Sequence, residues 1–212
     1  MPRQHLLKIG LRAALALALM LIAALLWGRQ YVQLWLPLYQ QVISWLMPDY
    51  RVVDIVLQSQ SSGQVVQLSV ELIHQTVLGL KLLPQGLSVS STTLQGHALQ
   101  HPILIATVLL AWPLGEKASW TQRLRLLGLG LIGLLIVEAL DVPFVLAGSI
   151  TDLLLADFAP HLQDKSGLVR WMHILNGGGR LALSVGAALI VVAGYHAYFT
   201  NVSTDYKHRQ NG

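Results

Sequence analysis

The sequence predicts an α-helical integral membrane protein with four transmembrane helices and a small β-rich extramembrane domain. Of its 212 residues, 54% are hydrophobic and only 11% are charged, whereas soluble domains carry about 25% charged residues. Four apolar stretches approach the ~20 residues that cross a bilayer as a helix, and a run of short β-branched segments lies between the first two. The chain contains no cysteine, so disulfides and thiolate chemistry are excluded.

Residues 1–30 are predicted to form an N-terminal anchor helix. Arg3, Lys8 and Arg12 precede an unbroken apolar run over residues 13–27. The run is long for a signal peptide and no small-residue cleavage site follows it, so we expect an uncleaved helix. Residues 31–49 mix tyrosine, tryptophan and glutamine and end at Pro48. That composition is typical of a helix that leaves the membrane or lies along its surface, and we expect an interfacial aromatic segment.

Residues 50–97 are predicted to form an extramembrane β domain. Short β-branched runs with partial alternation are separated by the turn-like sequences SQSSG and PQG. We expect four strands in an antiparallel sheet or an open barrel. A unit of this size is marginally stable alone. It should therefore pack against the membrane helices or against a partner.

Residues 98–150 are predicted to form a transmembrane hairpin, with spans over 98–115 and 126–150. The second of these contains Glu138 and Asp141. A carboxylate at hydrocarbon depth costs about 2.5–3.5 kcal/mol and usually faces the bundle interior or a wet cavity. Because Pro143 follows so closely, two interpretations stay open: the helix continues to Ile150 with a kink, or it breaks near Asp141.

Residues 151–179 are too interrupted by charge to span a membrane. They are expected to form two short amphipathic pieces in the interface, followed by a chain break at residues 176–179, which read NGGG. The last span is predicted over residues 180–199. It is rich in alanine, glycine and serine, a composition that favours close helix packing, and a cytoplasmic tail completes the segment 180–212.

The distribution of basic residues predicts the orientation. The N-terminus, the 116–125 loop and the C-terminal tail hold eight of the fourteen lysines and arginines. Positive residues concentrate on the cytoplasmic side. We therefore expect both termini in the cytoplasm, with the β domain and residues 151–179 together on the outer face of the membrane.

Under this topology, polar side chains gather at the outer ends of the spans. We expect a structural polar cluster of Glu138, Asp141, Asn176 and Arg180. Arg180 is the expected partner of Glu138, because an isolated ionised carboxylate is too costly at that depth. If Glu138 lies a turn deeper, Asp141 takes Arg180 instead, and Glu138 is protonated or pairs with a histidine.

A membrane-embedded enzyme or a metal-handling protein is the alternative interpretation of the same residues. Glu138, Asp141 and Arg180 would then be the catalytic candidates, and His97, His101 and His173 the candidate ligands of zinc or copper. The sequence contains no G-x-S-x-G, H-E-x-x-H or P-loop motif. We accordingly predict no cofactor and a chain that is not an enzyme.

The order of segments resembles a known family. An anchor helix, a small β-rich outer domain, a span that begins with a short polar-proline signal (GHALQHPILIATVLLAWP, residues 96–113), a hairpin and a last span look like the accessory membrane proteins that accompany exosortases in Gram-negative bacteria. The resemblance implies an accessory role in protein sorting. Exosortases themselves depend on a Cys–Arg–His set, and this chain has no cysteine to supply it.

The sequence therefore predicts a non-catalytic accessory or assembly subunit of an inner-membrane complex. Its expected partners are the lipid bilayer and other membrane protein subunits. No stripe of basic residues with interleaved aromatics indicates nucleic acid. A third hypothesis is passage of an ion or a small molecule past Glu138, which would require several copies of the chain.

Overall fold

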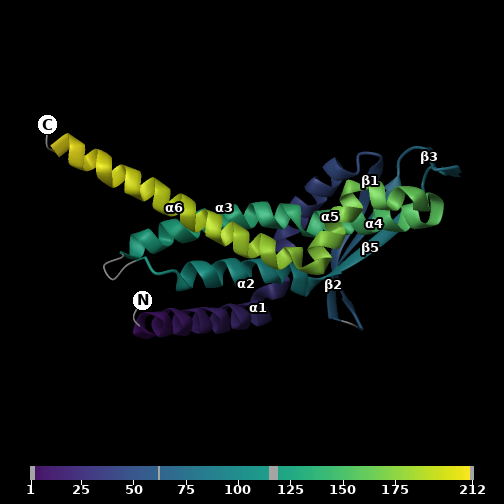
Figure 1. Ribbon diagram of the computed structural model, residues 1–212. Coiled ribbons are helices and arrows are strands. Elements are labelled where there is room, and N and C mark those ends of the chain that lie inside the picture. Colours follow the sequence, from purple (N-terminus) through teal and green to yellow (C-terminus); the bar gives the residue numbers. More distant parts are fainter. Residues whose placement is uncertain (1–2, 62, 115–118, 211–212) are drawn as a thin grey trace.

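The computed structural model describes residues 3–61, 63–114 and 119–210 (Figure 1). These residues form a set of helices with a small antiparallel sheet between the first two. A 3-10 turn (Pro160–Lys165) and a π-helical turn (Leu175–Gly179) join the later helices. The elements are α1 (Arg3–Leu46), β1 (Tyr50–Gln60), β2 (Gly63–Leu72), β3 (Thr76–Leu78), β4 (Lys81–Leu83), β5 (Ser88–Leu94), α2 (Gln95–Ala111), α3 (Trp120–Leu140), α4 (Val142–Phe158), α5 (Gly167–Ile174) and α6 (Arg180–Gln210).

Three helical stretches are long and apolar enough to cross a membrane: Leu7–Leu46, Trp120–Phe158 and Gly167–Tyr198. The remaining predicted span corresponds to α2, which has 17 residues and falls short of the ~20 that a crossing helix needs. Pro113 explains where α2 ends, because a residue that precedes proline is pushed out of the helical region. Trp112 accordingly has an extended backbone, with φ −61° and ψ 128°.

The sheet and the chain termini lie at opposite ends of the molecule. Figure 1 shows the start of α1, the end of α6 and the helix ends that flank residues 115–118 on one side, and the strands on the other. The basic segments that predicted the orientation thus share one end of the fold. Lys117, which entered that prediction, lies outside the described residues, as do the side chains of Arg3, Lys207 and Arg209.

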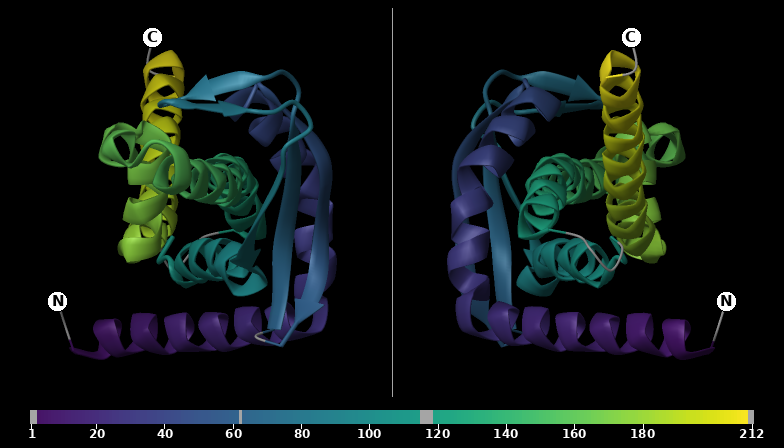
Figure 2. Two further views of the ribbon diagram at one scale, coloured as in Figure 1. Left: turned by 90° about the vertical axis from the view of Figure 1, so that its right-hand side faces the viewer. Right: turned by 90° about the vertical axis from the view of Figure 1, so that its left-hand side faces the viewer.

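The predicted interfacial segment 31–49 is not a separate element, because α1 continues through it to Leu46. In Figure 2 the first part of α1 diverges from the other helices, and its later part turns to run beside the sheet. Pro37 lies inside the helix, where its missing N–H removes one helical hydrogen bond. Gly28 lets α1 cross α2 closely, since a Cβ there would lie 2.8 Å from a methyl of Leu99.

The β region contains five strands where the sequence predicted four. Three form a sheet in the order β1-β2-β5, and β3 and β4 pair separately as a short hairpin. The central strand β2 is the most buried, and it packs with the later part of α1 and with α4 in one apolar core. Ser91 of β5 also donates a hydrogen bond of 2.9 Å to the carbonyl of Leu146 in α4. The sheet is therefore part of the helical body rather than an independent domain.

The predicted third span breaks at Asp141, which ends α3 and precedes α4. Asp141 has φ −101° and ψ −81°, and Pro143 occupies the first turn of α4, where a missing N–H costs no helical hydrogen bond. The break interrupts the helical ladder near the carbonyl of Leu140, which accepts a hydrogen bond of 3.0 Å from Trp171 Nε1 in α5. Asp141 is thus placed at a junction, with its side chain directed into the protein.

Residues 151–158 extend α4 rather than forming a separate amphipathic piece; α5 is the second predicted piece. The break predicted at residues 176–179 is a π-helical turn in which Gly178 has φ 107°. That left-handed conformation is unfavourable for residues with a Cβ. A Cβ on Gly179 would lie 2.6 Å from the carbonyl oxygen of Ile174. The glycines therefore allow the turn that brings Arg180 to the start of α6.

Candidate functional site

Seven polar side chains from four parts of the fold meet in the interior, and we call them the buried polar cluster. Asp141 lies at the α3–α4 junction, Glu138 one turn earlier in α3, and the others come from α1, α2 and α6. Glu138, Asp141, His101, Ser184 and Tyr39 have no exposed surface, Arg180 is 4% exposed and Tyr31 is half-buried. The members are Tyr31, Tyr39, His101, Glu138, Asp141, Arg180 and Ser184.

Asp141 is the centre of the cluster and connects α2 with α6. Arg180 Nε donates to both carboxylate oxygens, at 2.9 and 3.0 Å. On the other side, His101 Nε2 lies 2.7 Å from Asp141 Oδ2. Charge-assisted hydrogen bonds of this kind are shorter and stronger than neutral ones. One carboxylate therefore holds two helices that are distant in sequence.

Ser184 completes a chain of hydrogen bonds. Its hydroxyl donates to the carbonyl of Arg180 one turn earlier, at 2.8 Å, and its oxygen lies 2.7 Å from His101 Nδ1. A hydroxyl has one proton to donate, so His101 Nδ1 is the donor to Ser184. His101 thereby links Ser184 in α6 to Asp141 at the α3–α4 junction.

Glu138 is bound by α1. Tyr31 donates to Oε1 at 2.6 Å and Tyr39 donates to Oε2, so both carboxyl oxygens of Glu138 accept a hydrogen bond. The two tyrosines and Trp35 between them are spaced four residues apart, which puts them near one helical face. Arg180 and Asp141 form an ion pair within the cluster. Their mutual attraction offsets part of the large cost of burying each charge alone.

The structure places the predicted polar residues in two groups. Glu138, Asp141, Arg180 and His101 belong to the cluster, whereas Asn176 and His173 are exposed, so including Asn176 in it was wrong. Arg180 binds Asp141 and not Glu138. The expectation that Arg180 pairs with Glu138 was therefore wrong, and the stated alternative, in which Asp141 takes Arg180, is what the structure has. The partners of Glu138 are the tyrosines of α1 rather than a histidine.

Sequence reasoning missed Tyr31, Tyr39 and Ser184. The tyrosines were interpreted as interfacial anchors, and Ser184 as one small residue of a packing face. The available signal was spacing: Tyr31 and Tyr39 flank Trp35 at intervals of four, and Ser184 follows Arg180 by four. Nothing in that spacing shows which helix faces them.

His97 lies beside the cluster without joining it. Its Nδ1 is 3.2 Å from Thr93 Oγ1 at the end of β5. Burial, and then the positive charge of Arg180, lower the pKa of His97. Among residues 3–61, 63–114 and 119–210, no group of three or more His, Asp or Glu is arranged to hold a metal ion.

One buried donor in the cluster has no partner among the described residues. Arg180 Nη2 makes no hydrogen bond although it is inaccessible to solvent, and the same holds for Trp35 Nε1. Such atoms are uncommon in folded proteins. The guanidinium thus uses only Nε to hold Asp141, and Nη2 has hydrogen-bonding capacity left.

Fold and site together describe a mainly helical protein with three stretches of membrane-crossing length, a small sheet at one end and a buried polar cluster between its helices. Comparison of the chain with protein-family models, with curated proteins and with solved structures finds no match.

Proposed function

We propose that this chain is a non-catalytic accessory or assembly subunit of a bacterial inner-membrane complex. The observation that carries the proposal is the burial of the polar cluster. Asp141, His101 and Ser184 are fully inaccessible and hydrogen-bond to one another. A catalytic group must touch its substrate, and a network closed in this way instead holds α1, α2, α3 and α6 together.

The proposal includes a membrane topology. Four helices cross the bilayer, α2 with the help of the residues that follow it, and both termini are cytoplasmic. Both termini and the helix ends next to residues 115–118 lie at one end of the molecule (Figure 1). This arrangement agrees with the positive-inside pattern. Reporter fusions after residues 60, 120, 165 and 212 should alternate periplasmic, cytoplasmic, periplasmic and cytoplasmic. A cytoplasmic signal at residue 60 would overturn the topology.

The sheet offers a surface for a partner protein on the periplasmic side. β1 is an edge strand of eleven residues, and most of its side chains are exposed or half-buried. Long edge strands are templates for pairing with another chain. The resemblance of residues 96–113 to exosortase-associated accessory proteins directs the search toward a protein-sorting complex. Purification in mild detergent should recover a larger membrane protein with this chain.

A membrane-embedded enzyme is the second candidate, favoured by the order Ser184–His101–Asp141. If the Ser184 hydroxyl turned from the Arg180 carbonyl toward His101 Nδ1, the three side chains would form the relay that activates a serine for acyl transfer. Ser184→Ala distinguishes the two functions. An enzyme would lose complementation of a deletion strain at unchanged melting temperature, whereas a structural network would lose stability and function together.

A further inference from the structure

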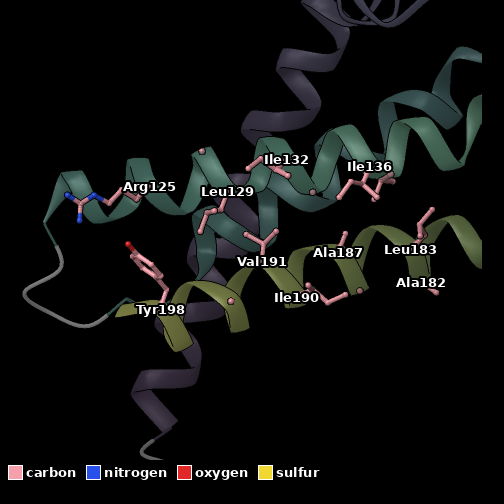
Figure 3. Close-up of a pocket in the computed structure, with 15 residues that line it drawn as sticks. Arg125, Leu129, Ile132, Ile136, Ala182, Leu183, Ala187, Ile190, Val191 and Tyr198 are labelled. Carbon is pink, nitrogen blue, oxygen red and sulfur yellow. The ribbon is translucent and has the colours of Figure 1, made fainter. Parts of the chain in front are cut away.

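An apolar groove of about 920 Å³ runs between α3 and α6. Figure 3 shows aliphatic side chains of both helices along it, with Arg125 and Tyr198 together at one end. None of the buried polar cluster residues lines this groove. Its lining residues are Arg125, Gly128, Leu129, Ile132, Gly133, Ile136, Val137, Ala182, Leu183, Gly186, Ala187, Ile190, Val191, Gly194 and Tyr198.

The groove is open because its walls carry glycines that nothing fills. A Cβ on Gly128, Gly186 or Gly194 would meet no atom within 4 Å. In the interface between α2 and α3, by contrast, a glycine is needed for contact: on Gly130 a Cβ would lie 2.3 Å from Leu109. α3 is therefore packed tightly against α2. Toward α6, space remains beside Gly128, Gly186 and Gly194, whereas at Gly133 a Cβ would lie 3.0 Å from Val191.

The length of the groove corresponds to one leaflet of a bilayer. From Arg125 to Val137 along α3 is about 18 Å, and from Ala182 to Tyr198 along α6 about 24 Å, at 1.5 Å per residue. Half of a bilayer with its headgroup region is about 20–22 Å thick. A partner transmembrane helix crosses the whole hydrocarbon core, about 30 Å, and would therefore extend beyond the groove.

The charge distribution matches an amphipathic ligand. Arg125 is the one charged residue in the lining, and it lies at the end where α3 starts, near the basic residue Arg123. Guanidinium groups bind phosphate well. Because a guanidinium has five N–H donors, Arg125 can bind a phosphate and still keep its interactions with other residues of the protein. The other lining residues are apolar apart from the phenol of Tyr198, and tyrosine is enriched at headgroup depth.

We propose that the α3–α6 groove binds one anionic phospholipid, with its phosphate at Arg125 and its acyl chains along Gly186 and Gly194. This inference rests on the proposed membrane location. In the proposed orientation the lipid belongs to the cytoplasmic leaflet, because Arg125 follows the cytoplasmic loop. The lipid fills the space between α3 and α6 and thereby joins their cytoplasmic halves.

The test is native mass spectrometry of the full chain released from nanodiscs that contain equal amounts of phosphatidylglycerol and phosphatidylethanolamine. We expect one phosphatidylglycerol to remain bound to the natural chain. Gly186→Leu and Gly194→Leu should each lower the retained fraction about tenfold, since a leucine displaces acyl methylenes from the groove. Gly10→Leu is the matched control, because Gly10 is in α1, equally free of neighbours and absent from the groove; it should retain the lipid.

Arg125→Gln tests the headgroup. We expect this variant to hold phosphatidylglycerol and phosphatidylethanolamine equally. Equal retention by Gly186→Leu and Gly10→Leu would overturn the proposal, as would a native dimer or a partner helix in the groove in place of lipid. Fractionation distinguishes the causes of failure: a chain found outside the membrane fraction contradicts the membrane location itself, whereas a membrane-bound chain without lipid contradicts only the groove.

Discussion

Asp141→Asn is the substitution that most directly tests the role of the buried polar cluster. Asparagine keeps the size of the side chain and removes the negative charge that both Arg180 and His101 contact. Removal of one partner from a buried ion pair costs about 3–5 kcal/mol, because the other charge is left uncompensated. This is a large part of the ~5–15 kcal/mol that stabilises a typical fold.

The expected effect can be converted into a melting temperature. For a chain of 150–250 residues, 1 kcal/mol changes the melting temperature by about 2–4 °C, so the Asp141→Asn variant should melt roughly 6–20 °C lower. The assay is thermal unfolding of the detergent-purified protein, with abundance in the membrane fraction measured in parallel. Asp54→Asn is the matched control, since Asp54 is exposed on β1, and exposed substitutions change stability by about 0.5 kcal/mol or less.

A double substitution separates charge pairing from other effects. If Asp141 and Arg180 stabilise each other, Asp141→Asn combined with Arg180→Gln should cost less than the sum of the two, by about 0.5–3 kcal/mol. The reasoning is refuted if Asp141→Asn melts within about 2 °C of the natural chain, less than 1 kcal/mol on the same scaling. Such a variant that also lost function would favour the enzyme instead.

Three further substitutions test other parts of the structure. Tyr39→Phe should destabilise the protein by about 1.5–3 kcal/mol, as expected for a lost hydrogen bond to a charged group. It should lower the melting temperature more than Tyr31→Phe does, because Tyr31 is only half-buried. Equal changes in melting temperature would contradict this difference between the two tyrosines. Gly178→Ala should cost about 1–2 kcal/mol in thermal unfolding because Gly178 has φ 107°, whereas Gly177→Ala, with no atom within 4 Å of its Cβ, should be nearly neutral. The fold lowers the pKa of His97, so neutral His97 is compatible with the folded state above the ordinary pKa of about 6.5, and stability is lost as the pH falls and the side chain takes up a proton. Between pH 7.5 and 5, the melting temperature of His97→Gln should therefore depend less on pH than that of the natural chain. An unchanged pH profile would exclude His97 as a source of the pH dependence.

The sequence by itself determined the elements of this protein and their boundaries to a useful degree. Helical runs of apolar residues, the β-branched segment over residues 50–94, the turns at SQSSG and PQG, and the glycine break before Arg180 all follow from local chemistry, and the structure has each of them. Local rules succeed there because the length of an apolar run, strand propensity and the conformational freedom of the backbone are properties of neighbouring residues in the chain. They fail at residues 31–49, where an interfacial composition lies within one continuous helix.

Only the tertiary structure decided which polar residues meet. Asp141 reaches Arg180, and Glu138 reaches Tyr31 and Tyr39, across 39, 107 and 99 residues of sequence. The break at Asp141 turns that carboxylate toward α2 and α6, whereas Glu138, one turn earlier, faces α1. Residues three apart in a helix lie near one face, so the different partners of the two acids depend on the break at Asp141 and on how the helices pack. That packing is set by contacts distant in sequence.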